Sequence, residues 1–184
     1  MENLLKKACD HLQQEKTILY PTDTVWGLGC DATNDEAVAK IYKIKEREES
    51  KSLVVLVSSL NMLKKHVSIS EKVKGILNKA TIPTTIIYTN PKGISQNVIA
   101  KDNTVAIRIV QDTFCRKLIK SFGKPIVSTS ANVSGEATPK SFSEISQPIL
   151  EGVDYIVNLN LDRITEKSST ILKIKGDTIE VIRA

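Results

Sequence analysis

The sequence predicts an α/β (α+β) fold in which helices pack on a mixed, twisted β-sheet. Short aliphatic runs rich in β-branched residues, at 53–57, 84–89 and 105–109, are typical of buried strands. Segments with helical periodicity separate some of these runs but not others. Because strands and helices do not alternate strictly along the chain, we expect a mixed sheet and not a purely parallel one.

The first quarter of the chain predicts a helix, a strand, a loop and a second helix. An apolar stripe at helical spacing starts the chain, and the short apolar run at 17–20 predicts a buried strand. Residues 21–29 contain one proline and two glycines, so we expect a loop there. Thr33, with Glu36 three residues later, predicts a capping box for a helix that ends near Lys45.

Three side chains in the middle and later parts of the chain are candidate helix caps. Ser70 precedes a short amphipathic segment, and Asp112 precedes a longer one that stops at Gly123. Ser141 is a candidate cap for one more short helix.

The remaining segments predict strands. The first, at 125–128, opens into a polar loop at 129–139. The others lie at 155–157, 170–174 and 178–182, and a Lys-Gly-Asp turn joins the last two.

Length and composition predict one domain, spanning residues 1–184, because domains most often contain about 100 to 200 residues. The formal net charge of +5 favours an anionic partner, which could be a nucleotide or a nucleic acid. No apolar stretch approaches the roughly 18 residues of a membrane-spanning helix, and the N-terminus lacks the apolar core of a signal peptide. We therefore expect a cytoplasmic protein without membrane contact, with its three cysteines as reduced thiols.

Three polar clusters are candidates for chemistry. The first, YPTDTVWGLGCDA, follows the first strand, where ligand-binding loops are common. The second, IKEREESK, carries Lys45, Arg47 and Lys51; in extended geometry Lys45 and Arg47 project to one side and could grip a triphosphate. The third, STSANVSGEATP, is dense in hydroxyls and amides that suit ribose, phosphate or an amino acid. Taken singly, each cluster also fits an ordinary solvated surface.

No glycine-rich fingerprint of the P-loop or dinucleotide type is present, so ATP would need another binding geometry. The order of the motifs is more specific. PTDTVWGLG, then Lys-x-Arg, TVAIR, STSAN-x-SG and SST together resemble the YrdC-like threonylcarbamoyl-AMP synthase family, over residues 19–183. The resemblance implies the YrdC-like (DHBP synthase-like) fold with a concave basic cleft, in its short single-domain form.

The resemblance also implies an activity. Members of the family form L-threonylcarbamoyladenylate from L-threonine, bicarbonate and ATP and release pyrophosphate. A partner transferase then passes the threonylcarbamoyl group to tRNA, and direct tRNA binding is an open expectation. Mg²⁺ is expected to bind through the ATP phosphates and water, because the sequence offers no dedicated carboxylate cage.

Carried over by motif, the site residues divide into two groups, with Lys45 and Arg47 as the catalytic charges. The threonine-binding residues would be Thr24, Arg108, Ser128 and Ser169. The ATP-binding residues would be Lys45, Arg47, Lys51, Thr104, Ser130, Asn132, Thr138 and Arg183. The role of Asp23 stays open between orienting a catalytic group, holding a metal-bound water and stabilising a turn. For Trp26, core packing is favoured over a pocket wall.

Two alternatives remain at this stage. A nucleic-acid-binding module without catalysis would also be cationic, and its binding would weaken steeply with salt. A related carbamoyl-adenylate-forming domain would use carbamoyl phosphate as its donor. Such domains normally belong to much larger proteins, so the length of this chain counts against that reading.

Overall fold

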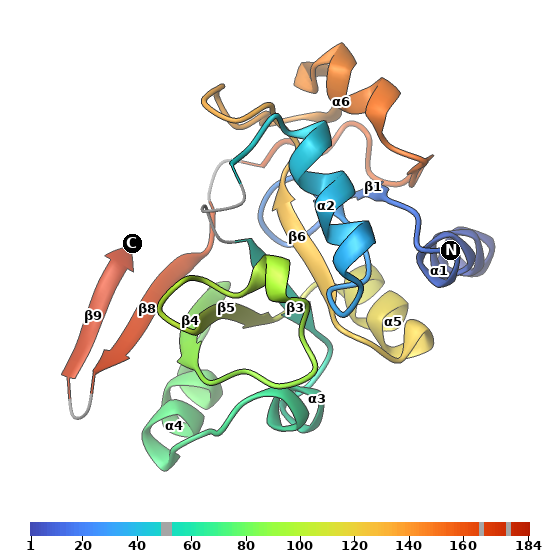
Figure 1. The fold of residues 1–184 in the computed structure, drawn as a ribbon. Coiled ribbons are helices and arrows are strands. Elements are labelled where there is room, and N and C mark those ends of the chain that lie inside the picture. Colours follow the sequence, from blue (N-terminus) through green and yellow to red (C-terminus); the bar gives the residue numbers. More distant parts are fainter. Residues whose placement is uncertain (49–52, 166–167, 176–177) are drawn as a thin grey trace.

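A computed structural model describes residues 1–48, 53–165, 168–175 and 178–184 (Figure 1). The helices are α1 (Glu2–Gln13), α2 (Asp35–Ile44), α3 (Leu60–His66), α4 (Glu71–Lys79), α5 (Thr113–Phe122) and α6 (Gln147–Gly152), with short 3₁₀ turns at Gln96–Val98 and Phe142–Glu144. The strands are β1 (Ile18–Tyr20), β2 (Gly27–Gly29), β3 (Val54–Val57), β4 (Thr84–Thr89), β5 (Thr104–Ile109), β6 (Ile126–Ser130), β7 (Tyr155–Ile156), β8 (Thr170–Lys175) and β9 (Thr178–Arg183).

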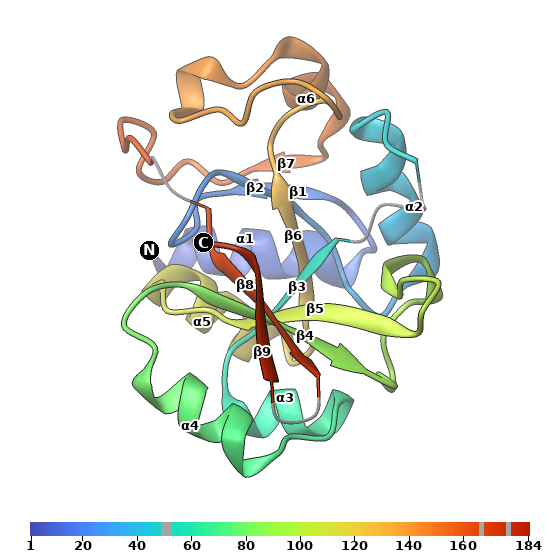
Figure 2. The same cartoon turned by 90° about the vertical axis from the view of Figure 1, so that its left-hand side faces the viewer.

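Within these ranges the strands form one mixed sheet in the order β7-β1-β2-β6-β3-β5-β4-β8-β9. The pairs β1/β7, β3/β5 and β4/β8 are parallel, and the other neighbours are antiparallel. The β8/β9 hairpin closes one edge of the sheet, away from α1 and α6 (Figures 1 and 2). The predicted mixed sheet with flanking helices is confirmed.

Helices cover both faces of the sheet. Successive side chains of a strand point to opposite faces, so Val55 and Val57 face one way and Leu56 faces the other. Val55 and Val57 pack with buried residues of α2, α3 and α4. Leu56 packs with α1 and α5. A third cluster joins Trp26 to the segment around α6, so the predicted packing role of Trp26 is confirmed.

Most of the predicted helix boundaries hold. Ser70 and Asp112 cap α4 and α5 through their side chains, and Gly123 ends α5 with a φ of 80°. The predicted cap at Thr33 is wrong: Asn34 takes that position and accepts a hydrogen bond from the Ala37 N–H. Ser141 starts a 3₁₀ turn without a side-chain cap bond.

The strand β2 and the helix α3 were not predicted, and β6 is longer than predicted. The expected loop at 21–29 ends in β2, because both of its glycines lie in a strand paired with β1 and β6. A Cβ on Gly29 would lie 2.2 Å from the Val127 carbonyl oxygen, so only glycine permits this close approach. β6 continues to Ser130, two residues beyond the predicted end.

The Lys-Gly-Asp turn falls partly outside the described residues. Of the helices in the described ranges, none has the length and apolar character to span a membrane.

Candidate functional site

A cavity of about 270 Å³ opens on the sheet face that carries α1 and α5. Cross-strand pairing places Val54 beside Ser128 and Ala106, and Leu56 beside Arg108, so these side chains share that face. Leu56 lies under the helices, whereas Val54 lines the open part. The lining residues are Thr24, Val25, Arg47, Leu53, Val54, Arg108, Ser128, Thr129, Ser130, Thr138, Ser168, Ser169, Ile171 and Arg183.

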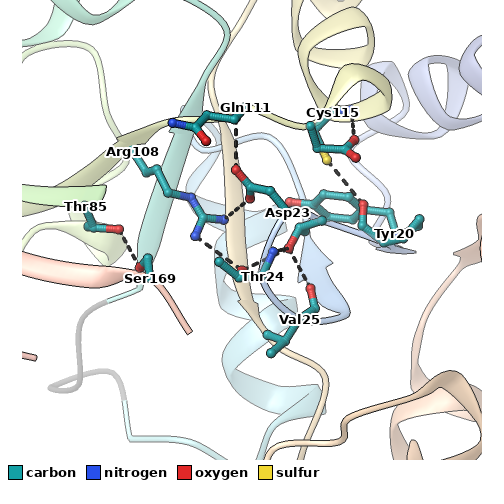
Figure 3. A network of polar contacts seen from close by, with 12 residues as sticks. Tyr20, Asp23, Thr24, Val25, Thr85, Arg108, Gln111, Cys115 and Ser169 are labelled. Atoms are coloured by element: carbon teal, nitrogen blue, oxygen red, sulfur yellow. Dashed lines mark hydrogen bonds and ion pairs between the residues drawn. The ribbon is translucent and has the colours of Figure 1, made fainter. Parts of the chain in front are cut away.

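Arg108 on β5 is the most enclosed cation of the cavity. Its Nη2 lies 3.0 Å from the Asp23 Oδ1, and its Nη1 donates to the Thr24 Oγ1 at 3.3 Å (Figure 3). The Arg108 and Asp23 side chains are only 4% and 10% exposed. Nε of Arg108 is buried and has no hydrogen-bond partner among the described residues. One donor of the guanidinium therefore remains available to an anionic ligand.

The hydroxyl of Thr24 has a fixed direction. The Thr22 hydroxyl donates to the Val25 carbonyl at 2.6 Å, so its only hydrogen is used there. In the 3.0 Å contact between the two hydroxyls, Thr24 must then donate and Thr22 accept. Because the Thr24 oxygen also accepts from Arg108, its remaining lone pair can only accept from a ligand N–H or O–H.

Two hydrogen bonds hold the 21–26 loop, which carries Asp23 and Thr24, and the strand residue before it in place. The Cys115 thiol on α5 donates to the Pro21 carbonyl at 3.3 Å, and the Tyr20 hydroxyl donates to the Val127 carbonyl at 3.1 Å. Burial raises the pKa of the Cys115 thiol well above its ordinary value, so this group stays protonated. A packed thiol at this position fits a supporting role.

Ser169 and Arg183 form the opposite wall. Arg183 on β9 donates from Nε to the Ser169 carbonyl at 2.9 Å and from Nη2 to the Ser169 hydroxyl at 3.2 Å. The same hydroxyl lies 2.8 Å from the Thr85 hydroxyl on β4. Burial, with a smaller effect from the neighbouring Arg108, lowers the pKa of Arg183.

Lys45 and Arg47 take different positions from those expected. Lys45 is the C-cap of α2 with αR geometry, and Glu46 has a φ of 48°, so the expected extended backbone at 45–47 is wrong. Lys45 is 1% exposed, and its Nζ donates to the carbonyls of Ser130 and Asn132, the latter at 2.6 Å. Arg47 lines the cavity, whereas Lys45 lies behind its wall.

The pKa of Lys45 is lowered to about 8, first by burial and then by the charge of Arg47. Its hydrogen bonds go to the last residue of β6, Ser130, and to Asn132 in the loop that follows. In this structure the ammonium therefore supports the end of β6 and the loop that carries Asn132.

Two further predicted residues, Thr104 and Asn132, are absent from the described cavity lining. Thr104 shares its strand face with Ala106 and Arg108, four residues from Arg108 along β5, and its hydroxyl donates to Asp102. Asn132 donates through Nδ2 to two carbonyls, while its buried Oδ1 has no partner in the described part of the chain. Lys51 lies outside the described residues.

Sequence reasoning left the role of Asp23 open and did not assign the lining residues Val25, Leu53, Val54, Ser168 and Ile171. Asp23 is bound to the predicted threonine ligand Arg108, and its Oδ2 accepts from the Gln111 N–H at 2.9 Å. None of the lining residues in the described ranges is acidic, so the cavity surface carries the positive charges of Arg47, Arg108 and Arg183. For Asp23, the signal in the sequence was its place in the polar loop after the first strand.

A mixed sheet with an arginine-lined, hydroxyl-rich cavity and no P-loop defines a class of α/β protein suited to an anionic ligand held beside a small polar one. The chain belongs to the Sua5/YciO/YrdC family, whose profile, described as "Telomere recombination", matches residues 10–184. The predicted family is confirmed.

Curated relatives and a solved structure agree with this assignment. A Methanocaldococcus jannaschii protein described as a putative threonylcarbamoyl-AMP synthase is 36% identical, over 97% of this chain and 86% of its own. The threonylcarbamoyl-AMP synthase of Pseudoalteromonas translucida is 32% identical, over 91% and 92%. The chain is thus a homologue of threonylcarbamoyl-AMP synthases.

The crystal structure of P. abyssi Sua5 complexed with L-threonine superposes with a TM-score of 0.87 at 23% identity. The match covers 97% of this chain and 53% of that one, so this chain spans about half the length of that Sua5. At this identity the likeness supports the fold alone.

Proposed function

We propose that this protein is an L-threonylcarbamoyladenylate synthase, a nucleotidyltransferase that joins L-threonine, bicarbonate and ATP and releases pyrophosphate. The observation that carries the proposal is the cavity in which Arg47, Arg108 and Arg183 meet the hydroxyls of Thr24, Ser128, Ser130 and Ser169. Similarity to synthases over more than nine-tenths of the chain supports it.

The end of the cavity at Arg108 suits the amino acid. The unpartnered Nε of Arg108 is a donor for a carboxylate, and the Thr24 oxygen is an acceptor for an amine or hydroxyl hydrogen. Ser128 and Ser169 line the same cavity and would complete the threonine pocket. A donor and an acceptor side by side match the two polar ends of an α-amino acid.

The end at Arg47 suits the nucleotide. Arg47, Ser130, Thr138 and Arg183 line the same cavity and would hold the phosphates, whereas Lys45 would act indirectly through the Ser130 and Asn132 carbonyls. Asn132 can offer only its Oδ1 as a free atom, which suits a ribose hydroxyl or an amino group rather than a phosphate. Lys51 and Thr104 remain proposed ATP ligands by resemblance.

The chemistry needs no covalent enzyme intermediate. The threonine amine adds to the carbon supplied by bicarbonate, water is lost, and an N-carboxylated threonine forms. Its carbamate oxygen forms a bond to the α-phosphorus while the bond from that phosphorus to the β-bridging oxygen breaks, releasing pyrophosphate. Fixed arginines would stabilise the charge on the leaving phosphates without reorganising.

The described lining residues do not form a protein-held Mg²⁺ site, because they include no carboxylate and Asp23 is bound to Arg108 and Gln111. A Mg²⁺ ion that accompanies ATP would be held by the phosphates and water. We further propose a cytoplasmic location and transfer of the product to a tRNA threonylcarbamoyl transferase complex; the net charge of +5 also favours direct binding of tRNA.

The test is pyrophosphate release by purified protein with ATP, Mg²⁺, bicarbonate and L-threonine. Release should stop when either threonine or bicarbonate is omitted. Release that needs carbamoyl phosphate in place of bicarbonate would assign the chain to the carbamoyl-adenylate class. RNA binding that falls steeply with salt, without any threonine-dependent release, would support a non-catalytic nucleic-acid module.

A further inference from the structure

Asp23 pairs with Arg108 through one oxygen and with the backbone beyond β5 through the other. One oxygen lies 3.0 Å from the Arg108 Nη2, and the other accepts the Gln111 N–H at 2.9 Å. Gln111 lies three residues after Arg108, just beyond the end of β5. The carboxylate therefore fixes the guanidinium relative to the strand that carries it (Figure 3).

The arrangement leaves one part of the guanidinium for a ligand. Asp23 and Thr24 are adjacent in the chain and engage Nη2 and Nη1, so they hold the far end of Arg108 from one side. Nε stays buried without a partner in the described ranges, and the Arg108 side chain borders the cavity. A ligand carboxylate that accepts one hydrogen bond from Nε and one from the second Nη2 hydrogen would form a bidentate pair with the guanidinium.

The charge balance points the same way. Arg47, Arg108 and Arg183 all line the cavity, and none of its described lining residues is acidic. Asp23 is the carboxylate in contact with the most buried of these cations. Without it, the Arg108 guanidinium would be free to turn toward the cavity and bind any anion, including a phosphate of the nucleotide.

We propose that Asp23 is a positioning residue that acts through Arg108: it holds the guanidinium so that its Nε edge receives the carboxylate of the amino-acid substrate. The proposal rests on the proposed function for the identity of the amino acid. Asp23 itself need not touch the substrate.

The chain offers a matched control. Asp31 is also a buried carboxylate that binds one cation and one backbone N–H: its Oδ2 lies 2.7 Å from the Lys124 Nζ, and its Oδ1 accepts from the Thr33 N–H at 2.8 Å. Neither Asp31 nor Lys124 lines the cavity. Asp23→Asn and Asp31→Asn therefore each remove the charge of one buried carboxylate, and of the two only Asp23 contacts Arg108; the Lys124 partner of Asp31 is 54% exposed, and the Thr33 hydroxyl also donates to Asp31.

The experiment measures equilibrium binding of L-threonine and of L-threoninol, which lacks the carboxylate, to wild type and to both variants. Asp23→Asn should weaken L-threonine binding about tenfold or more, since a buried charged partner is lost, and should change L-threoninol binding by less than about twofold. Asp31→Asn should leave both affinities within about twofold, whatever it does to thermal stability. In turnover, Asp23→Asn should raise KM for threonine and leave KM for ATP nearly unchanged.

Equal losses for the two ligands, or unchanged threonine binding in Asp23→Asn, would overturn the proposal. A second measurement does not need the substrate: the rate at which phenylglyoxal modifies Arg108, followed by mass spectrometry, should rise in Asp23→Asn and stay unchanged in Asp31→Asn. Equal rates in all three proteins would also overturn it. If the wild type binds no threonine, the proposed function fails, and the Arg108 modification rates alone decide whether Asp23 positions the guanidinium.

Discussion

The two ends of the cavity are built differently. At the proposed amino-acid end, Arg108 is 4% exposed and held by Asp23 and Thr24 from a loop about 85 residues away in the chain. At the proposed nucleotide end, Arg47 is half-buried, and Arg183 extends from an edge strand whose side chains are all exposed. The first is therefore the closed end of the cavity, and the second, with its more exposed arginines, is the open end.

This difference predicts that the two ends contribute differently to substrate binding. A fixed donor and acceptor lose little conformational entropy when a small amino acid binds, which favours selectivity for its shape and polarity. The more exposed arginines at the other end can adjust to phosphates whose charges shift as pyrophosphate leaves. We therefore expect substitutions at the closed end to act on threonine and those at the open end to act on ATP.

The largest effect is expected for Arg108→Ala. Removing a buried cation that pairs with both a carboxylate and the substrate should lower threonine-dependent pyrophosphate release about a hundredfold or more, through KM for threonine. Arg108→Lys should recover little of this loss, because an ammonium cannot form the bidentate pair. The measurement is steady-state kinetics with threonine varied at saturating ATP, and near-normal activity of Arg108→Ala would remove the distinction between the two ends.

Arg47→Ala should have the next largest effect, about thirtyfold on kcat/KM for ATP, because a phosphate-binding charge is lost from the cavity wall. Its effect on threonine affinity should be small. Lys120→Ala is the control, since Lys120 is an exposed basic residue of α5 outside the cavity. Equal losses in the two variants would show that charge anywhere on the surface, and not this site, supports activity.

The strands of the closed end could be predicted from the sequence, but their pairing could not. The runs at 84–89 and 105–109 are visible because β-branched residues dominate them. Asp23 and Arg108 lie 85 residues apart in the printed sequence, and no local pattern signals that they will meet. The motif order identified Arg108, whereas its partner required the tertiary structure.

The open end was harder to predict because its backbone is unusual. Glu46 has a left-handed backbone conformation, which turns the chain between Lys45 and Arg47. The two side chains therefore do not project to the same side, as an extended chain would predict. β2 was assigned to a loop for a similar reason, since its glycines are required by the neighbouring Val127 carbonyl and not by a turn. Both segments contact β6: the Lys45 Nζ donates to the Ser130 carbonyl, and Gly29 lies against the Val127 carbonyl.

Lys45→Met tests whether the open end depends on a buried charge. Activity should fall about tenfold, because the Ser130 and Asn132 carbonyls lose their donor.

The same variant gives a prediction for stability. The pKa of Lys45 is about 8 in the folded protein, below its ordinary value of 10.5. The unfolded chain therefore binds this proton more tightly between those values, so the unfolding free energy of the wild type should rise relative to that of Lys45→Met from about pH 8 upward. Urea unfolding of both proteins at pH 7.5 and 9.5 measures this difference.

Arg183→Ala should have the smallest effect, about threefold on KM for ATP, because the exposed edge strand β9 leaves its side chain partly in water. The Arg183 guanidinium also donates twice to Ser169, so its loss should remove two hydrogen bonds that hold Ser169 and weaken threonine binding slightly. Arg163→Ala is the control: within the described residues the Arg163 guanidinium pairs with the Asp112 carboxylate at 3.9 Å and does not line the cavity, so this variant should have no measurable effect on either substrate. A loss in Arg183→Ala as large as that in Arg108→Ala would contradict the distinction between the two ends. It would mean that Arg183 on the edge strand matters for activity as much as the buried Arg108 of the closed end.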